Sequence, residues 1–319
     1  MGQFKELLSQ KDVVILHGAL GTELEARGYD ISGELWSAKY LINDSDAITK
    51  IHEDYVLAGA DIITTSTYQA SLSSLQGVGI SNQEAEALII KSVELAKAAR
   101  KKAWEKVDEK VKGTRVYPLI SGDVGPYAAY LADGSEYTGE YGQVSKETLK
   151  DFHRSRIALF LKEEVDLLAL ETMPNILEIK ALTELLSEEF PEAEAYISVT
   201  SQDGASLSDG TGLRELVALV QDCPQIIALG VNCSSPEICE KVLSQLVGLT
   251  SLPLVAYPNS GEVYHGDTQT WHASDSVTHE VAAYHKKWQE MFEQLTLVGG
   301  CCRTRPDDIK KLRDGLSLN

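Results

Sequence analysis

The chain has 319 residues, and its 29 Lys and Arg against 48 Asp and Glu give a formal net charge of −19. Hydrophobic residues make up 43% and charged residues 24%, which is typical of a globular protein and excludes a disordered or fibrous one. Because a basic excess is missing, we expect neither nucleic acid nor an anionic membrane surface as a partner. The negative field is compatible with a cationic small ligand.

The first residues, MGQFKELLSQKD, are charged and lack the apolar core of a secretory signal, and position 6 is Glu rather than the Ser or Thr of a myristoylation signal. No run approaches the ~20 apolar residues that a membrane span needs. We therefore expect a cytoplasmic protein with reduced thiols. Its five cysteines all lie beyond residue 220, and this odd number indicates chemistry or metal binding rather than a disulfide framework.

Short apolar runs rich in β-branched residues recur along the chain, and each is followed by Gly, Asn, Glu or Cys. Runs of this kind are typical of strands that are buried on both faces of a parallel sheet. The predicted strands are Val13–Leu16, Asp61–Thr67, Val116–Ile120, Leu167–Leu170, Ala195–Val199, Ile226–Val231, Pro253–Ala256 and Leu295–Val298.

Segments with helical periodicity alternate with these strands. Several of them carry start signals, such as Ser145 before Lys146 and Ser235 before Pro236. Pro at the first helical position is favourable because its missing N–H would be unpaired there. The predicted helices are Ala47–Ala58, Gln83–Ala103, Lys146–Lys162, Ile176–Ser187, Gly212–Val220, Pro236–Leu246, Glu280–Gln294 and Pro306–Leu312.

This alternation of strands and helices predicts a (β/α)8 TIM barrel that forms a single domain over residues 1–319. A doubly wound open sheet is the alternative. The longest segment without predicted structure, Asp123–Gln143, is too long for an ordinary connection, and such loops are usually functional.

Residues just beyond the carboxyl ends of barrel strands face the active site. In this chain that rule selects residues 17–23, 64–68, 122–127, 171–172, 230–233, 257–260 and 299–303. The selection includes Cys233, Cys301 and Cys302, whereas Cys223 and Cys239 fall on helices and are expected to be plain buried residues.

Three converging thiolates suit Zn²⁺, and a site with three protein ligands keeps its fourth position open for chemistry. Adjacent residues of a regular strand point to opposite faces, so Gly299 and Gly300 would have to turn the backbone for Cys301 and Cys302 to meet one ion. Packing alone is the competing interpretation for each cysteine. A structural zinc is disfavoured because no fourth Cys or His stands at a suitable spacing.

Five motifs occur in order: residues 18–24 (GALGTEL), Glu171-Thr172, residues 230–233 (GVNC), residues 257–262 (YPNSGE) and residues 299–304 (GGCCRT). Together they resemble the homocysteine S-methyltransferases, and the resemblance extends from about Val13 to Leu312. Residues 125–137 look like the branch that uses S-methylmethionine rather than betaine. The resemblance implies a (β/α)8 barrel with Zn²⁺ on Cys233, Cys301 and Cys302, and L-homocysteine and a sulfonium donor as ligands.

The chemistry agrees with the resemblance. A free thiol has a pKa near ~8.5, and coordination to zinc removes its proton. The expected step is an in-line methyl transfer from the sulfonium to the homocysteine sulfur, which gives methionine. S-adenosylmethionine as the main donor, or selenohomocysteine as the acceptor, is the alternative within this chemistry. A thiol redox or metal-binding protein and a non-catalytic barrel are the alternatives outside it, and no oligomeric state is predicted.

The expected substrate-binding residues follow the same resemblance and rim positions. The loop of Gly18, Ala19, Leu20 and Thr22 is expected to offer backbone N–H groups to the homocysteine carboxylate. By resemblance, Glu171 takes the ammonium group, with a helix-capping acid as the alternative. Asn232, also a candidate for substrate binding, stands next to Cys233 and either supports that ligand or forms a turn. Tyr68, Tyr127 and Trp36 are candidates to face the sulfonium by cation–π attraction, with core packing as the alternative.

His17 departs from the family's pattern, which has Asp before the Gly-Ala loop. A neutral imidazole would hold an ammonium group poorly, so either Glu171 carries that contact alone or the affinity for the amino acid is weaker. We therefore expect the substitution His17→Asp to lower KM for homocysteine. His17 as a fourth metal ligand is disfavoured because it would close the site.

Overall fold

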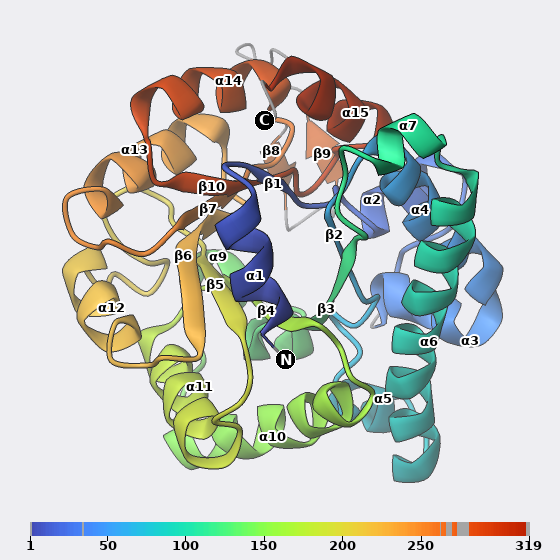
Figure 1. Cartoon of the computed structure of the whole chain (residues 1–319). Coiled ribbons are helices and arrows are strands. Elements are labelled where there is room, and N and C mark those ends of the chain that lie inside the picture. Colours follow the sequence, from blue (N-terminus) through green and yellow to red (C-terminus); the bar gives the residue numbers. More distant parts are fainter. Residues whose placement is uncertain (1, 34, 262, 266–269, 273–280, 317–319) are drawn as a thin grey trace.

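Parallel strands form a barrel in the computed structural model, which describes residues 2–33, 35–261, 263–265, 270–272 and 281–316. The eight strands are β1 (Val14–Ile15), β2 (Ile62–Thr64), β3 (Leu119–Val124), β4 (Leu167–Met173), β5 (Ala195–Val199), β6 (Ile226–Asn232), β7 (Leu254–Tyr257) and β10 (Leu295–Val298). They are ordered β1-β10-β7-β6-β5-β4-β3-β2, and a parallel bridge between Leu16 and Ile62 joins the two ends (Figure 1). The predicted (β/α)8 barrel is confirmed, and the open sheet is excluded.

The eight predicted helices are all present and surround the strands. They are α4 (Ser45–Ala58), α6 (Asn82–Lys106), α10 (Lys146–Lys162), α11 (Ile176–Glu189), α12 (Leu213–Val220), α13 (Pro236–Leu246), α14 (Val281–Met291) and α15 (Pro306–Gly315). The start signals act as expected, because the Ser145 and Ser235 side chains accept hydrogen bonds from backbone N–H groups of the first turn of α10 and α13. Glu280, where one helix was predicted to begin, lies outside the described residues, as does Glu262 of the YPNSGE motif.

Shorter elements were not predicted. They are α1 (Gln3–Gln10), α2 (Gly21–Ala26), η1 (Trp36–Lys39), α3 (Tyr40–Asn43), α5 (Leu72–Gly77), α7 (Glu109–Lys112), α8 (Tyr127–Leu131), α9 (Ser135–Thr138) and the antiparallel pair of β8 (Val263–His265) and β9 (Thr270–His272). The helices α8 and α9 lie within the segment Asp123–Gln143, for which no structure was predicted.

The third strand begins later than predicted. Its expected range was Val116–Ile120, whereas β3 covers Leu119–Val124. Pro118 explains the late start because proline lacks the N–H group that a ladder needs, and pairing begins with the hydrogen bond from Leu119 N to Asp61 O. The strand therefore continues further toward the carboxyl end and includes Asp123.

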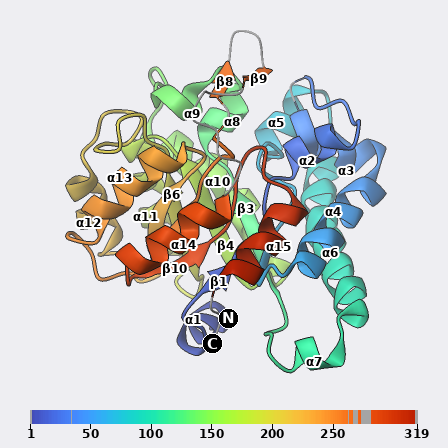
Figure 2. The same ribbon diagram turned by 90° about the horizontal axis from the view of Figure 1, so that it is seen from above.

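The amino end of the barrel is filled by α1. Phe4 and Leu7 are buried among side chains of the barrel interior, and the Phe4 ring lies 6.3 Å from the ring of Tyr196. Glu194 accepts a hydrogen bond from Phe4 N, which fixes the start of this helix. Figure 2 shows α1 at one end of the molecule and α2, α5, α8, α9 and the β8–β9 pair at the other. Ligands therefore have their space at the carboxyl end.

None of the described helices combines the length and the apolar character that crossing a membrane would require.

Gly230 lies where β6 and β7 approach most closely. A Cβ atom built there would lie 1.8 Å from Val255 O, which is backbone and cannot move aside. We expect Gly230→Ala to lower the free energy of unfolding by about 1–3 kcal/mol, as measured by denaturant titration. Gly77→Ala, whose added Cβ would meet nothing within 4 Å, is the control and should change it by less than about 0.5 kcal/mol. Equal effects of the two substitutions would contradict this explanation.

Candidate active site

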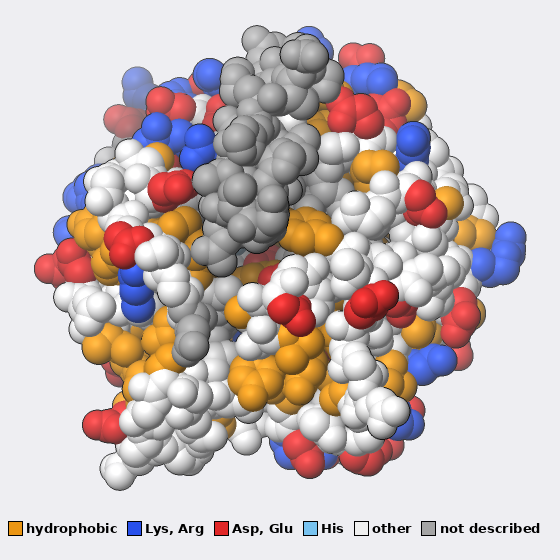
Figure 3. All heavy atoms as spheres, turned by 180° about the vertical axis from the view of Figure 1, so that it is seen from behind, with side chains coloured by type: hydrophobic (Ala, Val, Ile, Leu, Met, Phe, Trp, Pro, Cys, Tyr) orange, Lys and Arg blue, Asp and Glu red, His pale blue; other side chains and the backbone are white. Residues whose placement is uncertain are grey.

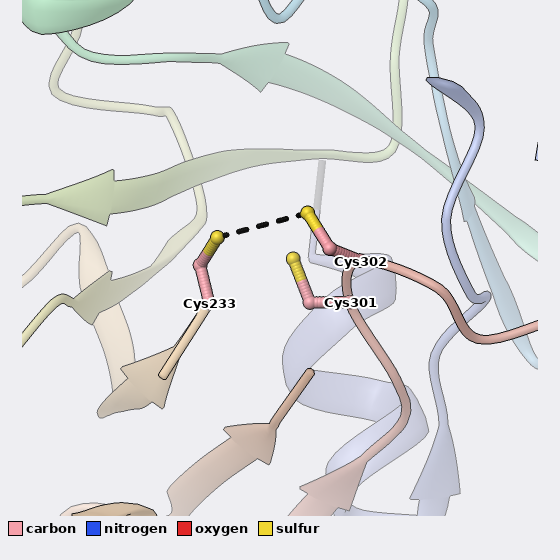
Figure 4. A group of neighbouring side chains, drawn as sticks. All are labelled: Cys233, Cys301 and Cys302. Carbon is pink, nitrogen blue, oxygen red and sulfur yellow. Dashed lines mark hydrogen bonds between the residues drawn. The ribbon is translucent and has the colours of Figure 1, made fainter. Parts of the chain in front are cut away.

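Three cysteines meet at the carboxyl end of the barrel. Cys233 follows β6, and Cys301 and Cys302 follow β10 after two glycines. Their sulfur atoms all lie within 4.8 Å of one another, and the Sγ atoms of Cys233 and Cys302 are 3.9 Å apart. Figure 4 shows Cys233 facing the other two cysteines, with the three sulfur atoms directed toward a common point. Cys223 and Cys239 are buried elsewhere and do not join this group.

Unusual backbone conformations occur at and beside the three cysteines. Cys233 has a φ of 49°, in the left-handed region that few residues other than glycine adopt. Thr172 at the end of β4 and Arg303 after Cys302 share it, with φ values of 63° and 67°. A β-branched residue such as Thr172 is rare in this region, and such conformations concentrate at functional sites.

Gly300 allows the chain to come close to the following turn. A Cβ atom on Gly300 would lie 2.6 Å from the Thr304 Oγ1 atom, so this position has room only for glycine. The turn is then held from the loop after β7, because Cys301 N donates to Pro258 O at 2.8 Å and Cys302 N donates to Asn259 Oδ1 at 3.2 Å. The two cysteines thus leave the regular strand before they approach Cys233.

Asn232 connects the ends of two strands. Its Oδ1 atom accepts from Thr172 N at 2.9 Å, and its Nδ2 atom donates to Thr172 Oγ1 at 2.8 Å. The same Nδ2 atom lies 4.0 Å from Cys301 Sγ. Asn232 was predicted as a substrate-binding residue, but it does not line the cavity. Its contacts are those of a residue that orients Thr172 and Cys301.

A cavity of about 510 Å³ opens beside the three cysteines. Of the other residues predicted for the site, those that line it are His17, Gly18, Ala19, Leu20, Trp36, Tyr68 and Glu171. Thr22 does not line it, because its Oγ1 atom accepts a hydrogen bond from Arg303 N at 2.8 Å and holds the loop after Cys302. Tyr127 also lies away from it, with its ring 5.1 Å from the ring of Phe152. Of the two alternatives for Tyr127, the structure therefore supports packing against other aromatic rings.

The cavity wall is acidic. Neither lysine nor arginine occurs among the described residues that line it, whereas Glu171 and Asp123 do. Removal from bulk water raises the pKa of Glu171 to about 7, against the opposing effect of the hydrogen bond that Tyr257 donates at 3.1 Å. Figure 3 shows this end of the molecule, with Asp and Glu side chains near the middle of the face and most Lys and Arg side chains around its margin.

Two histidines of the wall carry no charge at neutral pH. Burial lowers the pKa of His17 to about 4 and that of His52 to about 3. The ring of His17 lies 5.8 Å from the ring of Tyr55, whose hydroxyl group donates to Ala19 O at 2.6 Å. The two imidazole rings therefore add no positive charge to the acidic cavity wall.

Asp123 and His52 were missed as site residues. The sequence held a signal for Asp123, which is an acid near the carboxyl end of a predicted strand. Asp123 falls within residues 122–127, which the strand-end rule selects, but the predicted strand Val116–Ile120 ends before it and therefore gives no direction for its side chain. His52 lies inside α4, and nothing in its spacing showed that it reaches the cavity.

Comparison with known proteins adds independent evidence. The family model described as homocysteine S-methyltransferase matches residues 14–316. The homocysteine S-methyltransferase of Escherichia coli K12 is 46% identical over 309 residues, which cover 97% of each chain. The selenocysteine Se-methyltransferase of Brassica oleracea var. italica is 39% identical over 319 residues and covers 98% of this chain and 91% of its own.

A solved structure agrees with these sequence matches. The crystal structure of the homocysteine methyltransferase MmuM from Escherichia coli in its metallated form superposes with a TM-score of 0.85 at 44% identity. The match covers 98% of this chain and 99% of that one. Fold and sequence thus agree over nearly the whole length, and the chain is an enzyme that belongs to the homocysteine S-methyltransferase family.

Proposed function

We propose that this enzyme transfers a methyl group from S-methylmethionine to the thiol of L-homocysteine, which gives methionine, and that Cys233, Cys301 and Cys302 hold a Zn²⁺ ion. The single observation that carries the proposal is the approach of three thiols within 4.8 Å at the edge of the cavity. The metallated form of the MmuM structure supports a metal at such a site.

The three thiols fit zinc. Tetrahedral Zn²⁺ with Zn–S distances of about 2.3 Å requires sulfur atoms about 3.8 Å apart. The Sγ atoms of Cys233 and Cys302 are 3.9 Å apart. Without a metal, the hydrogen bond with Cys233 and burial raise the pKa of Cys301 well above its usual value, so a cation is needed to hold three thiolates together. When bound, zinc would supply the positive charge that lowers the pKa of the homocysteine thiol.

The side chains around the cavity would orient homocysteine. Glu171 would hold the ammonium group, which is the role implied by its position and its lack of a cationic partner in the cavity wall. The Gly18–Leu20 loop would present backbone N–H groups to the carboxylate. A Cβ on Gly18 would lie 2.8 Å from the Tyr55 hydroxyl oxygen, so glycine allows this loop to pack closely against Tyr55, which holds the loop in place.

The donor would bind against Tyr68 and Trp36, whose side chains line the same cavity. Aromatic faces attract cations, and a sulfonium in an acidic cavity meets no repelling lysine or arginine among the described lining residues. In the reaction, the bond between the sulfonium sulfur and the methyl carbon breaks while that carbon bonds to the homocysteine sulfur. The sulfonium leaves as a neutral thioether, and the thiol proton passes to water. Most of the rate enhancement would come from holding the two sulfur atoms in line.

Selenohomocysteine is a second candidate acceptor. The observation that favours it is the similarity to a protein named selenocysteine Se-methyltransferase, at 39% identity. A selenol would occupy the same place as the thiol. S-adenosylmethionine remains the alternative donor because it is also a sulfonium.

We expect about one zinc ion per chain in the purified enzyme. Cys233→Ala should lose both the metal and the activity, because the two remaining thiols offer too few ligands. Cys239→Ala is the matched control, since this buried thiol on α13 lies outside the group. Metal content measured by atomic emission spectroscopy tests the expectation, and full zinc occupancy in Cys233→Ala would contradict the assignment.

We expect methionine to form fastest with S-methylmethionine, more slowly with S-adenosylmethionine and not at all with betaine. Betaine carries its methyl groups on nitrogen, which is a poorer leaving group than a sulfonium. Chromatographic assays of methionine with the three donors in parallel, with homocysteine and selenohomocysteine as acceptors, provide the measurement. If no donor yields methionine, the proposed function is wrong.

We expect kcat/KM for homocysteine to rise as the pH increases through about 7. The pKa of Glu171 is raised to about 7, so the carboxyl group is protonated below that pH and cannot hold an ammonium ion well. Glu171→Gln should lower kcat/KM by about 10- to 100-fold at pH 8, which corresponds to a lost charged hydrogen bond, and should remove this step from the profile. Glu290→Gln on the exposed side of α14 should leave the profile unchanged. An identical step in Glu171→Gln would assign it to another group.

A further inference from the structure

Asp123 is a buried residue whose carboxyl group forms no hydrogen bond with the part of the chain that the structure describes. Its side chain is 3% exposed and lines the cavity, and its Oδ1 atom accepts no hydrogen bond from any described residue. The backbone around it is fully engaged, since Asp123 N donates to Thr65 Oγ1 and Asp123 O accepts from Thr67 Oγ1. The strand is thus held firmly while the carboxyl group remains unsatisfied.

The position of Asp123 in the sheet directs it toward Glu171. Asp123 pairs with Ala169 of β4, and Glu171 lies two residues further along the same strand. Leu167 and Ala169 belong to the barrel interior, so the alternation along β4 directs Glu171 inward as well. Paired positions of neighbouring parallel strands face the same side, and the two carboxyl groups therefore approach one space from adjacent strands.

No described cation forms an ion pair with Asp123 or Glu171. Burial, followed by the charge of Glu171, raises the pKa of Asp123 well above its usual value. Arg156 on α10 is the cation that opposes this effect, but its guanidinium group donates to Thr67 O and Gly125 O and forms no ion pair with Asp123 among the described residues. An unpaired buried carboxyl group destabilises a folded chain, so the presence of one in the cavity wall points to a ligand that pairs with it.

The end of β1 offers no carboxylate at position 17. His17 stands where the resemblance to the family leads us to expect Asp, and its imidazole is neutral at physiological pH. An ammonium ion has three N–H donors, and a single carboxylate leaves some of them unpaired. In this chain, a second carboxylate is available from β3 rather than from the end of β1.

We propose that Asp123 binds the α-ammonium group of homocysteine together with Glu171, as the second carboxylate of a two-acid subsite. This inference rests on the proposed function, because the proposed function places the homocysteine sulfur at the three cysteines. Asp123 lies one pair of residues deeper in the barrel than Glu171, about 7 Å along the strand. Asp123 would therefore contact homocysteine, which reaches furthest into the cavity, rather than the methyl donor, which would bind nearer the cavity entrance.

The test uses Asp123→Asn, which keeps the shape of the side chain and removes its charge. We expect KM for homocysteine to rise about 10-fold or more, with kcat and KM for S-methylmethionine changed less than about twofold. The matched control is Asp222→Asn, which should leave both KM values unchanged, since Asp222 is exposed and does not line the cavity. An unchanged KM for homocysteine in Asp123→Asn overturns the inference.

An analogue without the amino group separates binding from a structural role. With 4-sulfanylbutanoate as the acceptor, the natural enzyme and Asp123→Asn should have the same kcat/KM, because this acceptor carries no ammonium group for Asp123 to bind. The melting temperature of the ligand-free variant should be equal or higher, since an unpaired buried carboxyl group has been removed. A lower melting temperature with equal losses for both acceptors would show that Asp123 is structural. Asp123→Ser, assayed in the same way, provides a second variant if the amide does not fold.

Restoring a carboxylate at the other wall completes the test. His17→Asp should lower KM for homocysteine more strongly in the Asp123→Asn variant than in the natural enzyme, because only the variant lacks its second carboxylate. Equal effects in both backgrounds would show that the two positions act on different groups and overturn the inference. If the natural enzyme itself forms no methionine, the proposed function has failed instead, and isothermal titration of homocysteine into the natural and Asp123→Asn proteins still tests the subsite.

Discussion

The closure of the barrel is the constraint on which the site depends. Because all eight strands are parallel and the bridge between Leu16 and Ile62 completes the circle, every strand delivers its last residues to the same rim. Cys233 and Cys301 are 68 residues apart in the sequence, yet they meet there because β6 and β10 both end at this rim. The energy that holds three thiols in contact comes from the buried strands and helices beneath them, not from the site.

The same rim concentrates polar groups that the protein alone does not satisfy. Left-handed backbone at Thr172 and Cys233, crowded thiols and a carboxyl group without a partner at Asp123 all occur within one cavity wall. Each of these features costs stability, and each is compensated only by the rigid barrel around it. Functional sites commonly break local rules in this way, and the described core beneath the cavity shows how the remaining chain supports it.

Much of this arrangement could be predicted from the sequence, for definite reasons. Strands that are buried on both faces produce continuous apolar runs, so the ranges Ala195–Val199 and Leu295–Val298 agree with the structure at both ends. Placement at strand ends was enough to select the three cysteines. The error at β3 arose because Val116-Tyr117-Pro118 has the composition of a strand, whereas proline prevents pairing there. The choice between cavity and packing stayed open for Tyr127 because a loop position does not reveal which way a ring points, and α8 turns that ring toward Phe152.

The helix α1 has a kinetic consequence. Since Phe4 and Leu7 fill the amino end of the barrel, ligands reach the cavity from its carboxyl end. A small thiol at the cysteines would then lie beneath a larger sulfonium bound after it, and it could not depart until the upper molecule had left. In a cavity of this shape the acceptor would bind before the donor, and the methylated acceptor would leave after the demethylated donor.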